Sequence, residues 1–404
     1  MNAKANVVVD QVVLWTKTEI IECSAPSISR RLQIAIMSWN DDIAYAMTPF
    51  KLLTLPLGVW PLQKYNTFSL VRSIVCGVSM TAMMIMLFLE INFGSSDAYV
   101  KLDDLMLMSC NILCVLKLLS YRLYADNLIR NYSSAVKDYL AIDDEWKRII
   151  MRRHAYMGRI ICYICILSTY GCSLIWTVMP MLAADGDVHI PAGVYFVISS
   201  MESFILLLTG TSNCGNDALF FAIVLHVCGQ MELLKIEFTK YGKTNKNENE
   251  NFSVLGSRHR YLMEHAKLLT DVISFVLLVQ VLFSCLIISL IGFQFILALK
   301  VNDAVMIIKS VSVLASFLFQ LFFYSFVGDY LKCQMEDIAD SIYSSNWYCL
   351  STKLMRNVLF VTMRSQQPVQ LLAGKFFIIN IRTYMTILKS SLSYLSVLRV
   401  MMDT

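Results

Sequence analysis

Long apolar runs, separated by polar segments, dominate the pattern along this chain. A membrane-spanning helix needs about 20 mostly apolar residues in a row. Seven segments reach that length or come close to it: residues 68–92, 102–123, 157–181, 194–227, 271–299, 305–327 and 371–401. The pattern predicts an all-α membrane protein with seven transmembrane helices, of which the fourth and the seventh are long enough to tilt or to project from the bilayer.

The composition agrees with a membrane protein and excludes several other classes. Of the 404 residues, 57% are hydrophobic and 16% are charged, whereas soluble domains carry about 25% charged residues. No basic stretch is interleaved with aromatic residues, as nucleic-acid binding would require.

The five histidines form no ligand cluster and no Ser-His-Asp or paired-carboxylate spacing is present, so we expect neither an enzyme nor a cofactor. The 12 cysteines lie within apolar segments or on the predicted cytosolic side, so we expect no disulfide and no metal site.

Lysine and arginine are distributed unevenly between the two sides of the predicted membrane. Most of the 34 basic residues fall in the amino-terminal region and in the loops between spans 2 and 3, 4 and 5, and 6 and 7. The opposite side has only Lys101, Lys300 and Arg399. Because loops rich in lysine and arginine stay in the cytosol, we predict a cytosolic amino terminus and an extracellular carboxyl terminus. G-protein-coupled receptors have the opposite orientation, and their DRY-type and NPxxY-type motifs are absent here.

The polar segments divide the chain into four parts. Residues 1–66 form a cytosolic amino-terminal region with a short interfacial helix and turn at residues 43–60. Residues 67–330 hold spans 1 to 6 with helical extensions into the cytosol, and residues 331–367 form amphipathic cytosolic helices that need a packing partner. Residues 368–404 form the seventh span and a short extracellular tail. Because Pro368 interrupts the helical pattern, we predict a seventh helix split into a cytosolic half, up to about Ser365, and a membrane half from about Val369.

Charged and small polar residues make the last span unusual. Arg382 and Lys389 lie inside its apolar stretch and are followed by several serines. Charges within a membrane face a protein interior or water, so this helix is predicted to line a water-filled path. The alternative, in which both cations reach back to the membrane surface and the serines only pack, stays open. Ser393, Val397 and Met401 are spaced i, i+4 and i+8, so they share one face near the outer end.

A set of short blocks, most of them in the carboxyl-terminal half, gives the chain a resemblance to a known family. The blocks are Leu278-Val-Gln280, Ile291-Gly-Phe293-Gln294, Gly328-Asp329, Ala339-Asp340, Trp347-Tyr348, Gln366-Gln367-Pro368, Ala373-Gly374 and Leu388-Lys389 with Ser393-Tyr394. Earlier matches are Gly58-Val-Trp60-Pro61, Asp217, His226 and Gln230, so that roughly residues 38–399 are covered. On these residues the chain resembles the insect odorant receptor family.

The resemblance implies a seven-helix subunit of an odorant-gated, non-selective cation channel in the plasma membrane of olfactory sensory neurons. In that family a ligand-tuned subunit assembles with a co-receptor into a heterotetramer around one pore, which the last helix lines. This chain lacks the co-receptor's insertion between spans 4 and 5, so it is similar to a tuning subunit. The resemblance places Val397 and Met401 at the family's apolar gate, with Ser393 close by. The natural ligand would be a small, volatile, apolar molecule.

The resemblance also implies a ligand pocket in the outer half of spans 2, 3, 4 and 6. Thr169, Cys172 and Trp176, at i, i+3 and i+7 in span 3, match the family's pocket stripe. Further candidates are Met108 in span 2, and Tyr195 and Ser199 in span 4. For any one of these residues, a lipid-facing or core-packing role remains the alternative, and Trp176 could instead anchor the helix at the membrane boundary.

Two other classes stay open at this point. The sister gustatory receptor family ends its last span with Thr-Tyr and then Gln-Phe, and only Thr383-Tyr384 is present here. A secondary transporter would show inverted repeats and paired broken helices, whereas this chain shows one broken helix and no repeat. Residues 1–36 lie outside the resemblance and show no cleavable signal peptide. We interpret them as a gene-model extension or a dispensable tail, with Met37 as the alternative start.

Overall fold

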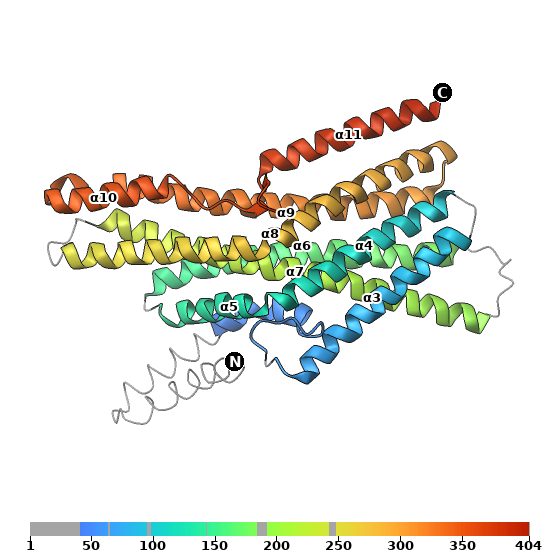
Figure 1. Ribbon diagram of the computed structural model, residues 1–404, viewed down its shortest axis with the longest axis horizontal. Helices are drawn as coiled ribbons and strands as arrows, with labels where there is room; N and C mark the ends of the chain where they lie inside the picture. Colours follow the sequence, from blue (N-terminus) through green and yellow to red (C-terminus); the bar gives the residue numbers. More distant parts are fainter. Residues whose placement is uncertain are drawn as a thin grey trace.

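The computed structural model describes residues 41–403, apart from residues 64, 95–97, 143, 184–191 and 242–247. These residues are almost entirely helical (Figure 1). The long helices are α3 (Thr67–Phe93), α4 (Ala98–Leu123), α6 (Glu145–Ala183), α7 (Ala192–Lys240), α8 (Glu248–Val301), α9 (Ala304–Tyr343) and α11 (Ile381–Asp403). Shorter elements are a helix over residues 41–54, α5 (Ala125–Leu140), the 3₁₀ turn η1 (Trp347–Cys349), α10 (Thr352–Ser365), β1 (Leu372–Ala373) and β2 (Phe377–Ile378).

The seven long helices confirm the predicted seven-helix architecture. Within the described residues, five of them, α3, α6, α7, α8 and α9, are long and apolar enough to cross a membrane. The other two, α4 and α11, carry charges inside their apolar stretches, namely Lys117 in α4 and Arg382 and Lys389 in α11. The short helix predicted at residues 43–60 is present at residues 41–54, where Phe50 is buried against the bundle.

Several helices are longer than a bilayer requires. Helix α8 has 54 residues, which at 1.5 Å per residue gives a length of about 80 Å, whereas the hydrocarbon core is about 30 Å thick. The extra length of α6, α7, α8 and α9 runs together with α5 and α10 at one end of the molecule (Figure 1). We call this end the anchor end. The carboxyl terminus and the turn between α8 and α9 lie at the opposite end (Figure 1).

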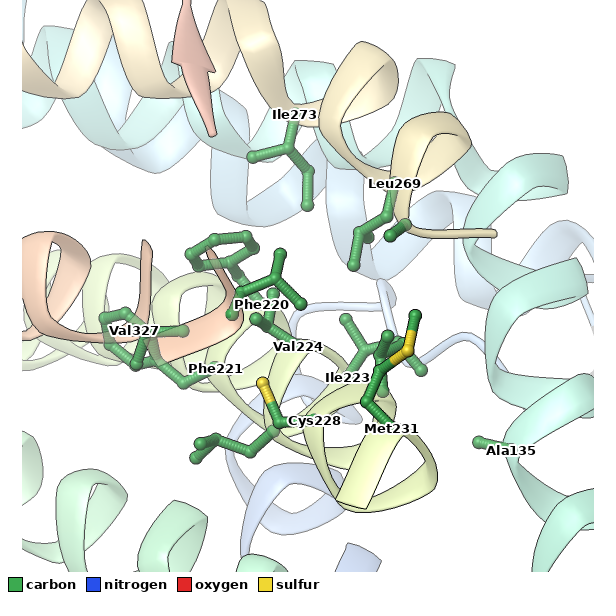
Figure 2. Packing of buried hydrophobic residues seen from close by; sticks show 14 of the residues in the cluster. Ala135, Phe220, Phe221, Ile223, Val224, Cys228, Met231, Leu269, Ile273 and Val327 are labelled. Atoms are coloured by element: carbon green, nitrogen blue, oxygen red, sulfur yellow. The ribbon is translucent and has the colours of Figure 1, made fainter. Parts of the chain in front are cut away.

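The larger hydrophobic core centres on α7, which packs against α6 and α9 and has the most buried apolar window of the candidate spans. Figure 2 shows Phe220, Phe221 and Val224 of α7 directed at Ile273 of α8 and Val327 of α9. These side chains are almost completely buried. Each buried aromatic or aliphatic side chain contributes about 1.5–3 kcal/mol relative to exposure, so α7 is the axis on which the bundle is assembled.

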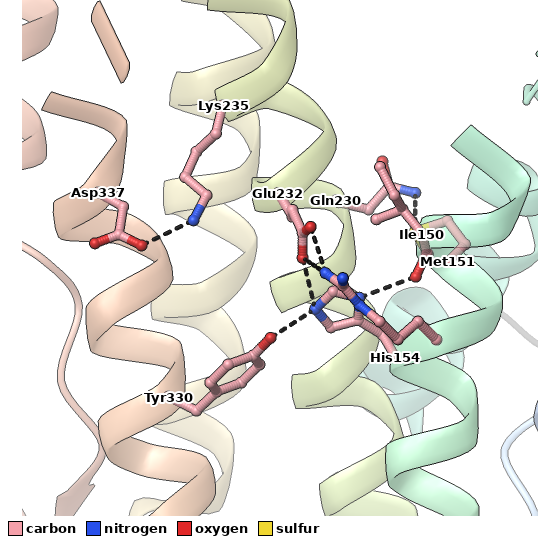
Figure 3. A network of polar contacts seen from close by, with 9 residues as sticks. Ile150, Met151, His154, Gln230, Glu232, Lys235, Tyr330 and Asp337 are labelled. Atoms are coloured by element: carbon pink, nitrogen blue, oxygen red, sulfur yellow. Dashed lines mark hydrogen bonds and ion pairs between the residues drawn. The ribbon is translucent and has the colours of Figure 1, made fainter. Parts of the chain in front are cut away.

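Polar contacts join the same helices at the anchor end (Figure 3). His154 of α6 is buried, and its Nε2 lies 3.0 Å from Tyr330 Oη of α9 and 3.5 Å from a carboxylate oxygen of Glu232 of α7. Lys235 of α7 pairs with Asp337 of α9 at 2.8 Å. Because each contact joins two different helices, the network fixes the register of α6, α7 and α9 where they extend beyond the apolar spans.

The split of the seventh helix is confirmed, but the predicted start of its membrane half is wrong. Helix α10 ends at Ser365, as expected, whereas α11 begins at Ile381 instead of near Val369. The intervening chain forms the antiparallel β1–β2 hairpin, whose turn holds Gly374 and Lys375 at φ 58° and 64°. Residues with positive φ cannot continue a right-handed helix, so the apolar residues near Leu371 pack in the hairpin instead of in α11.

Candidate functional site

A cavity lies between α4, α6, α7 and α9, beside the second hydrophobic cluster of the structure. Each helix contributes residues spaced three or four apart, so one face of each helix is turned to the cavity. The volume of the cavity is about 100 Å³. Its wall is largely apolar and includes five thiols, from Cys110, Cys114, Cys165, Cys172 and Cys214. A concave, mostly apolar wall with few polar groups is typical of sites for small organic ligands.

The sequence-predicted pocket stripe lines this cavity. Thr169, Cys172 and Trp176 all contribute to its wall from α6. Close contact between α6 and α7 occurs at Gly210, where an added Cβ would lie 2.8 Å from the Cγ2 atom of Thr169. The glycine therefore allows the two helices to approach each other beside the cavity.

The other predicted site residues are placed differently. Met108 is half-buried in α4 and is not among the residues that line the cavity, to which the neighbouring Met106 and Leu107 contribute instead. The side chains of Tyr195 and Ser199 lie outside the described residues, as do those of Val397 and Met401. Ser393 is exposed on α11.

The wall contributed by α9 is deeper than the sequence suggested. The resemblance implied the outer half of span 6 (residues 305–327), and α9 lines the cavity with Val313 from that half and with Ser316, Phe317 and Gln320. The last three residues lie one to two helical turns further toward the anchor end than Val313. The difference arises because the cavity follows the helix contacts toward the middle of the bundle, which sequence periodicity cannot locate.

A cation closes the end of the cavity that lies away from the anchor end. Lys309 Nζ of α9 lies 4.1 Å from the ring centroid of Trp176 and 2.9 Å from Asp103 Oδ2 of α4. Gln294 of α8 donates a hydrogen bond from Nε2 to the other oxygen of Asp103. The cation–π contact holds the indole ring in place over this end of the cavity.

A buried charge pair closes the opposite end. Lys117 Nζ of α4 lies 2.5 Å from Asp217 Oδ1 of α7, and the two side chains are 0% and 2% exposed. Lys117 also donates to Asn213 Oδ1 at 2.6 Å. Asp217 accepts two further hydrogen bonds from α9, one from Tyr324 Oη and one from Gln320 Nε2. Every charged atom of the pair thus has a partner, as a buried ion pair requires, and three helices meet at this point.

Sequence reasoning missed this polar end of the cavity. Lys117 lies within the second predicted span and Asp217 belongs to one of the family blocks, but the sequence pattern did not predict their pairing. Two opposite charges inside apolar segments indicate that the two side chains pair, because burying an unpaired charge there costs much free energy. Asn213 and Gln320 gave no such signal, since uncharged polar residues are common in helices that pack together.

Comparison with known proteins adds a family match and several relatives. The model of the family described as 7tm Odorant receptor matches residues 100–392. Among curated proteins of Drosophila melanogaster, Odorant receptor 9a is 28% identical over 214 residues, which are 52% of this chain and 52% of that protein. Odorant receptor 13a is 25% identical over 224 residues, with 51% and 53% covered. The chain thus spans about half the length of the curated relatives it matches.

The fold also matches solved structures. The insect olfactory receptor OR5 from Machilis hrabei, in complex with eugenol, superposes with a TM-score of 0.76 at 14% sequence identity, covering 89% of this chain and all of that one. A second structure of the same receptor gives the same TM-score, with 90% of this chain and 98% of that one covered. At this identity the likeness is one of fold.

Proposed function

Because the chain belongs to the 7tm odorant receptor family, we propose that it is the ligand-binding subunit of an odorant-gated, non-selective cation channel. The observation that carries the proposal is the mostly apolar cavity between α4, α6, α7 and α9. The ligand would be a small volatile molecule with a largely apolar surface. The subunit would lie in the plasma membrane of olfactory sensory neurons, with the anchor end in the cytosol and the carboxyl terminus outside.

The size of the cavity links ligand binding to a change of shape. A cavity of about 150 Å³ holds a benzene molecule in a protein interior, whereas the volume here is about 100 Å³. We therefore propose that a volatile molecule larger than benzene widens the space between the four helices. A ligand shifts an equilibrium only by its difference in affinity for the two states, and a cavity that fits the ligand better when widened supplies that difference.

Helix α9 provides a direct connection from the cavity to α11. Phe317 lines the cavity and belongs to the hydrophobic cluster on which Tyr384 and Ile387 of α11 pack. One turn further along α9, the Phe322 ring meets the Tyr384 ring edge-on, with 5.8 Å between the centroids. A displacement of α9 by the ligand would therefore move the inner part of α11.

The exposed face of α11 supports a pore-lining role. Arg382, Lys389 and Ser393 are all exposed on this subunit. Charges at membrane depth need water or protein partners, and the described residues of one subunit offer no ion pair to Arg382 or Lys389, so we propose that this face borders the pore between subunits. Val397 and Met401 would then form the apolar gate, which blocks ions by excluding water when it is narrow.

Apolar side chains left exposed at the anchor end support assembly with other subunits. Leu354 and Val358 of α10 are buried, but Leu359, Phe360 and Met363 on the same helix are 58%, 70% and 56% exposed. A row of exposed apolar residues on an otherwise packed helix indicates a protein contact surface. We propose that the co-receptor subunits of a heterotetramer cover this row.

Filling the cavity tests the proposal. We expect Cys172→Phe to lower odorant sensitivity by at least about tenfold, because the added ring occupies most of a cavity of about 100 Å³. The measurement is the odorant-evoked current after co-expression with the co-receptor, normalised to the amount of subunit at the cell surface. Leu174→Phe is the matched control, since Leu174 lies on the same helix but is 64% exposed. Equal sensitivity of the two variants would place the ligand elsewhere.

A further inference from the structure

The polar end of the cavity has hydrogen-bonding atoms that the protein leaves open. Asn213 and Gln320 both line the cavity and both contact the buried Lys117–Asp217 pair. Each of their amide groups has one atom directed to that pair, and the chemistry of the pair decides which atom it is.

The orientation of Asn213 follows from Lys117. An ammonium group only donates hydrogen bonds, so the atom 2.6 Å from Lys117 Nζ must be the amide oxygen of Asn213. The amide nitrogen Nδ2 then has no hydrogen-bond partner within the described part of the chain. Asn213 is half-buried and lines the cavity, so it offers an unpaired N–H donor to a ligand there.

The orientation of Gln320 follows from Asp217 by the same reasoning. A carboxylate only accepts hydrogen bonds, so Gln320 must donate from its nitrogen Nε2 to Asp217 Oδ2. Its oxygen Oε1 has no hydrogen-bond partner among the residues that the structure describes. Because Gln320 lines the cavity and is 7% exposed, it presents a free acceptor at the same end as the Asn213 donor.

Most hydroxyl groups along the wall have already used their donors. Ser168 donates to the carbonyl oxygen of Cys165, Ser173 to that of Thr169, and Ser316 to those of Ser168 and Ser312. These hydroxyls return to helix backbone carbonyls, as serines in apolar helices commonly do. Trp176 Nε1, near the opposite end of the wall, is a buried donor without a partner among the described residues. The two amides therefore form the open donor–acceptor pair at the polar end of the cavity.

The charges nearby do not favour a charged ligand. Lys117 and Asp217 neutralise each other at 2.5 Å, so the end of the cavity has no net charge. A ligand amine would meet the Lys117 ammonium, a ligand carboxylate would meet Asp217, and either ion would also lose its hydration in an apolar cavity. The geometry favours a neutral group that donates one hydrogen bond and accepts one.

We propose that this cavity selects alcohols and phenols, with the ligand hydroxyl accepting a hydrogen bond from Asn213 Nδ2 and donating one to Gln320 Oε1. A hydroxyl group satisfies both open atoms with a single oxygen. A ketone or an ether would satisfy only the donor, and a hydrocarbon neither. The proposal rests on the proposed function, since it names the ligand class for that same cavity.

The test compares ligands of one carbon skeleton on the assembled channel. The probes are small alcohols, each paired with its ketone and its methyl analogue, with cyclohexanol, cyclohexanone and methylcyclohexane as one such set. We expect the alcohol to activate at about tenfold lower concentration than the methyl analogue, with the ketone between them, because each open amide atom contributes one net hydrogen bond.

Substitutions assign the preference to the two amides. Asn213→Leu removes the N–H donor and leaves Lys117 paired with Asp217, and Gln320→Met removes the acceptor. Each should reduce the advantage of the alcohol over the methyl analogue by about threefold to tenfold. Ser173→Ala is the matched control, because Ser173 lines the cavity with its donor already used. Surface biotinylation of every variant separates lost binding from lost folding.

The outcomes separate this proposal from the proposed function. The proposal holds if the alcohol activates the channel at the lowest concentration in each set, and if this preference is lost in the two amide variants but kept in Ser173→Ala. If the channel responds equally to all members of a set, or best to hydrocarbons, the hydroxyl preference is refuted while the odorant-gated channel stands. If Cys172→Phe leaves every response unchanged, the ligand binds outside this cavity, and the cavity no longer supports either the hydroxyl preference or the proposed function.

Discussion

Loss of either charge of the buried Lys117–Asp217 pair should be among the most damaging single changes in this protein. We expect Lys117→Met or Asp217→Asn alone to cost about 3–5 kcal/mol, because each leaves the opposite charge buried without a counter-ion. Both side chains are almost fully buried, so water cannot compensate. The measurement is the thermal stability of the detergent-solubilised protein, together with the fraction of subunit that reaches the cell surface.

The double variant shows whether the cost comes from the unpaired charge. Lys117→Met combined with Asp217→Asn removes both charges and keeps a side-chain oxygen for Tyr324 to donate to. It should recover most of the stability that either single variant loses. Arg260→Met is the control, since the Arg260–Glu264 pair is 4.0 Å apart and largely exposed, and its loss should cost less than about 1 kcal/mol. Single variants as stable as the wild type would contradict the paired arrangement.

Adding one methyl group at Gly328 should uncouple the last helix. A Cβ at this position would overlap the backbone carbonyl oxygen of Ile379, just before α11 begins, and would contact Leu371 in the hairpin segment at 3.4 Å. The next residue, Asp329, accepts a hydrogen bond from the Ile381 N–H at 2.9 Å, which fixes the first turn of α11 to α9. We expect Gly328→Ala to cost about 1–3 kcal/mol through overpacking and to abolish or grossly reduce the odorant-evoked current.

A glycine without close neighbours provides the comparison for Gly328. Around Gly256, in α8, no heavy atom lies within 4 Å of an added Cβ, so Gly256→Ala should leave the current intact and can stabilise the helix by up to about 1 kcal/mol. Both variants are compared by current per subunit at the cell surface. A Gly328→Ala channel that responds like the Gly256→Ala channel would show that the contact between α9 and Ile379 does not transmit gating.

Much of the fold could be predicted because apolar runs of membrane length are an unusually strong signal. Each of the seven predicted spans corresponds to a long helix, and α10 ends at Ser365 as expected. The start of α11 could not be predicted in this way, because the residues after Pro368 are as apolar as a span. Only the positive φ angles at Gly374 and Lys375, which depend on packing against α8 and α9, make this segment a hairpin.

The candidate site was predictable on one helix and not across helices. Thr169, Cys172 and Trp176 share a stripe on α6, so a single helical period placed all three in the cavity wall. Asn213 and Gln320 lie on two different helices and are more than a hundred residues apart in sequence. Their open amide atoms depend on which atoms are the contact partners of Lys117 and Asp217. Those partners are a property of the packed bundle, which no periodicity within one segment reports.

The central claim is that this chain binds an odorant and thereby opens an ion channel without an intermediary. The most direct measurement is the whole-cell current of cells that express the chain together with the odorant co-receptor, recorded while an odorant panel is applied and G-protein signalling is blocked. We expect an inward cation current that appears with the odorant, persists under the block and needs at least about tenfold more odorant in the Cys172→Phe subunit. A chain that reaches the cell surface but gives no odorant-evoked current, or gives a current that the block abolishes, would contradict it.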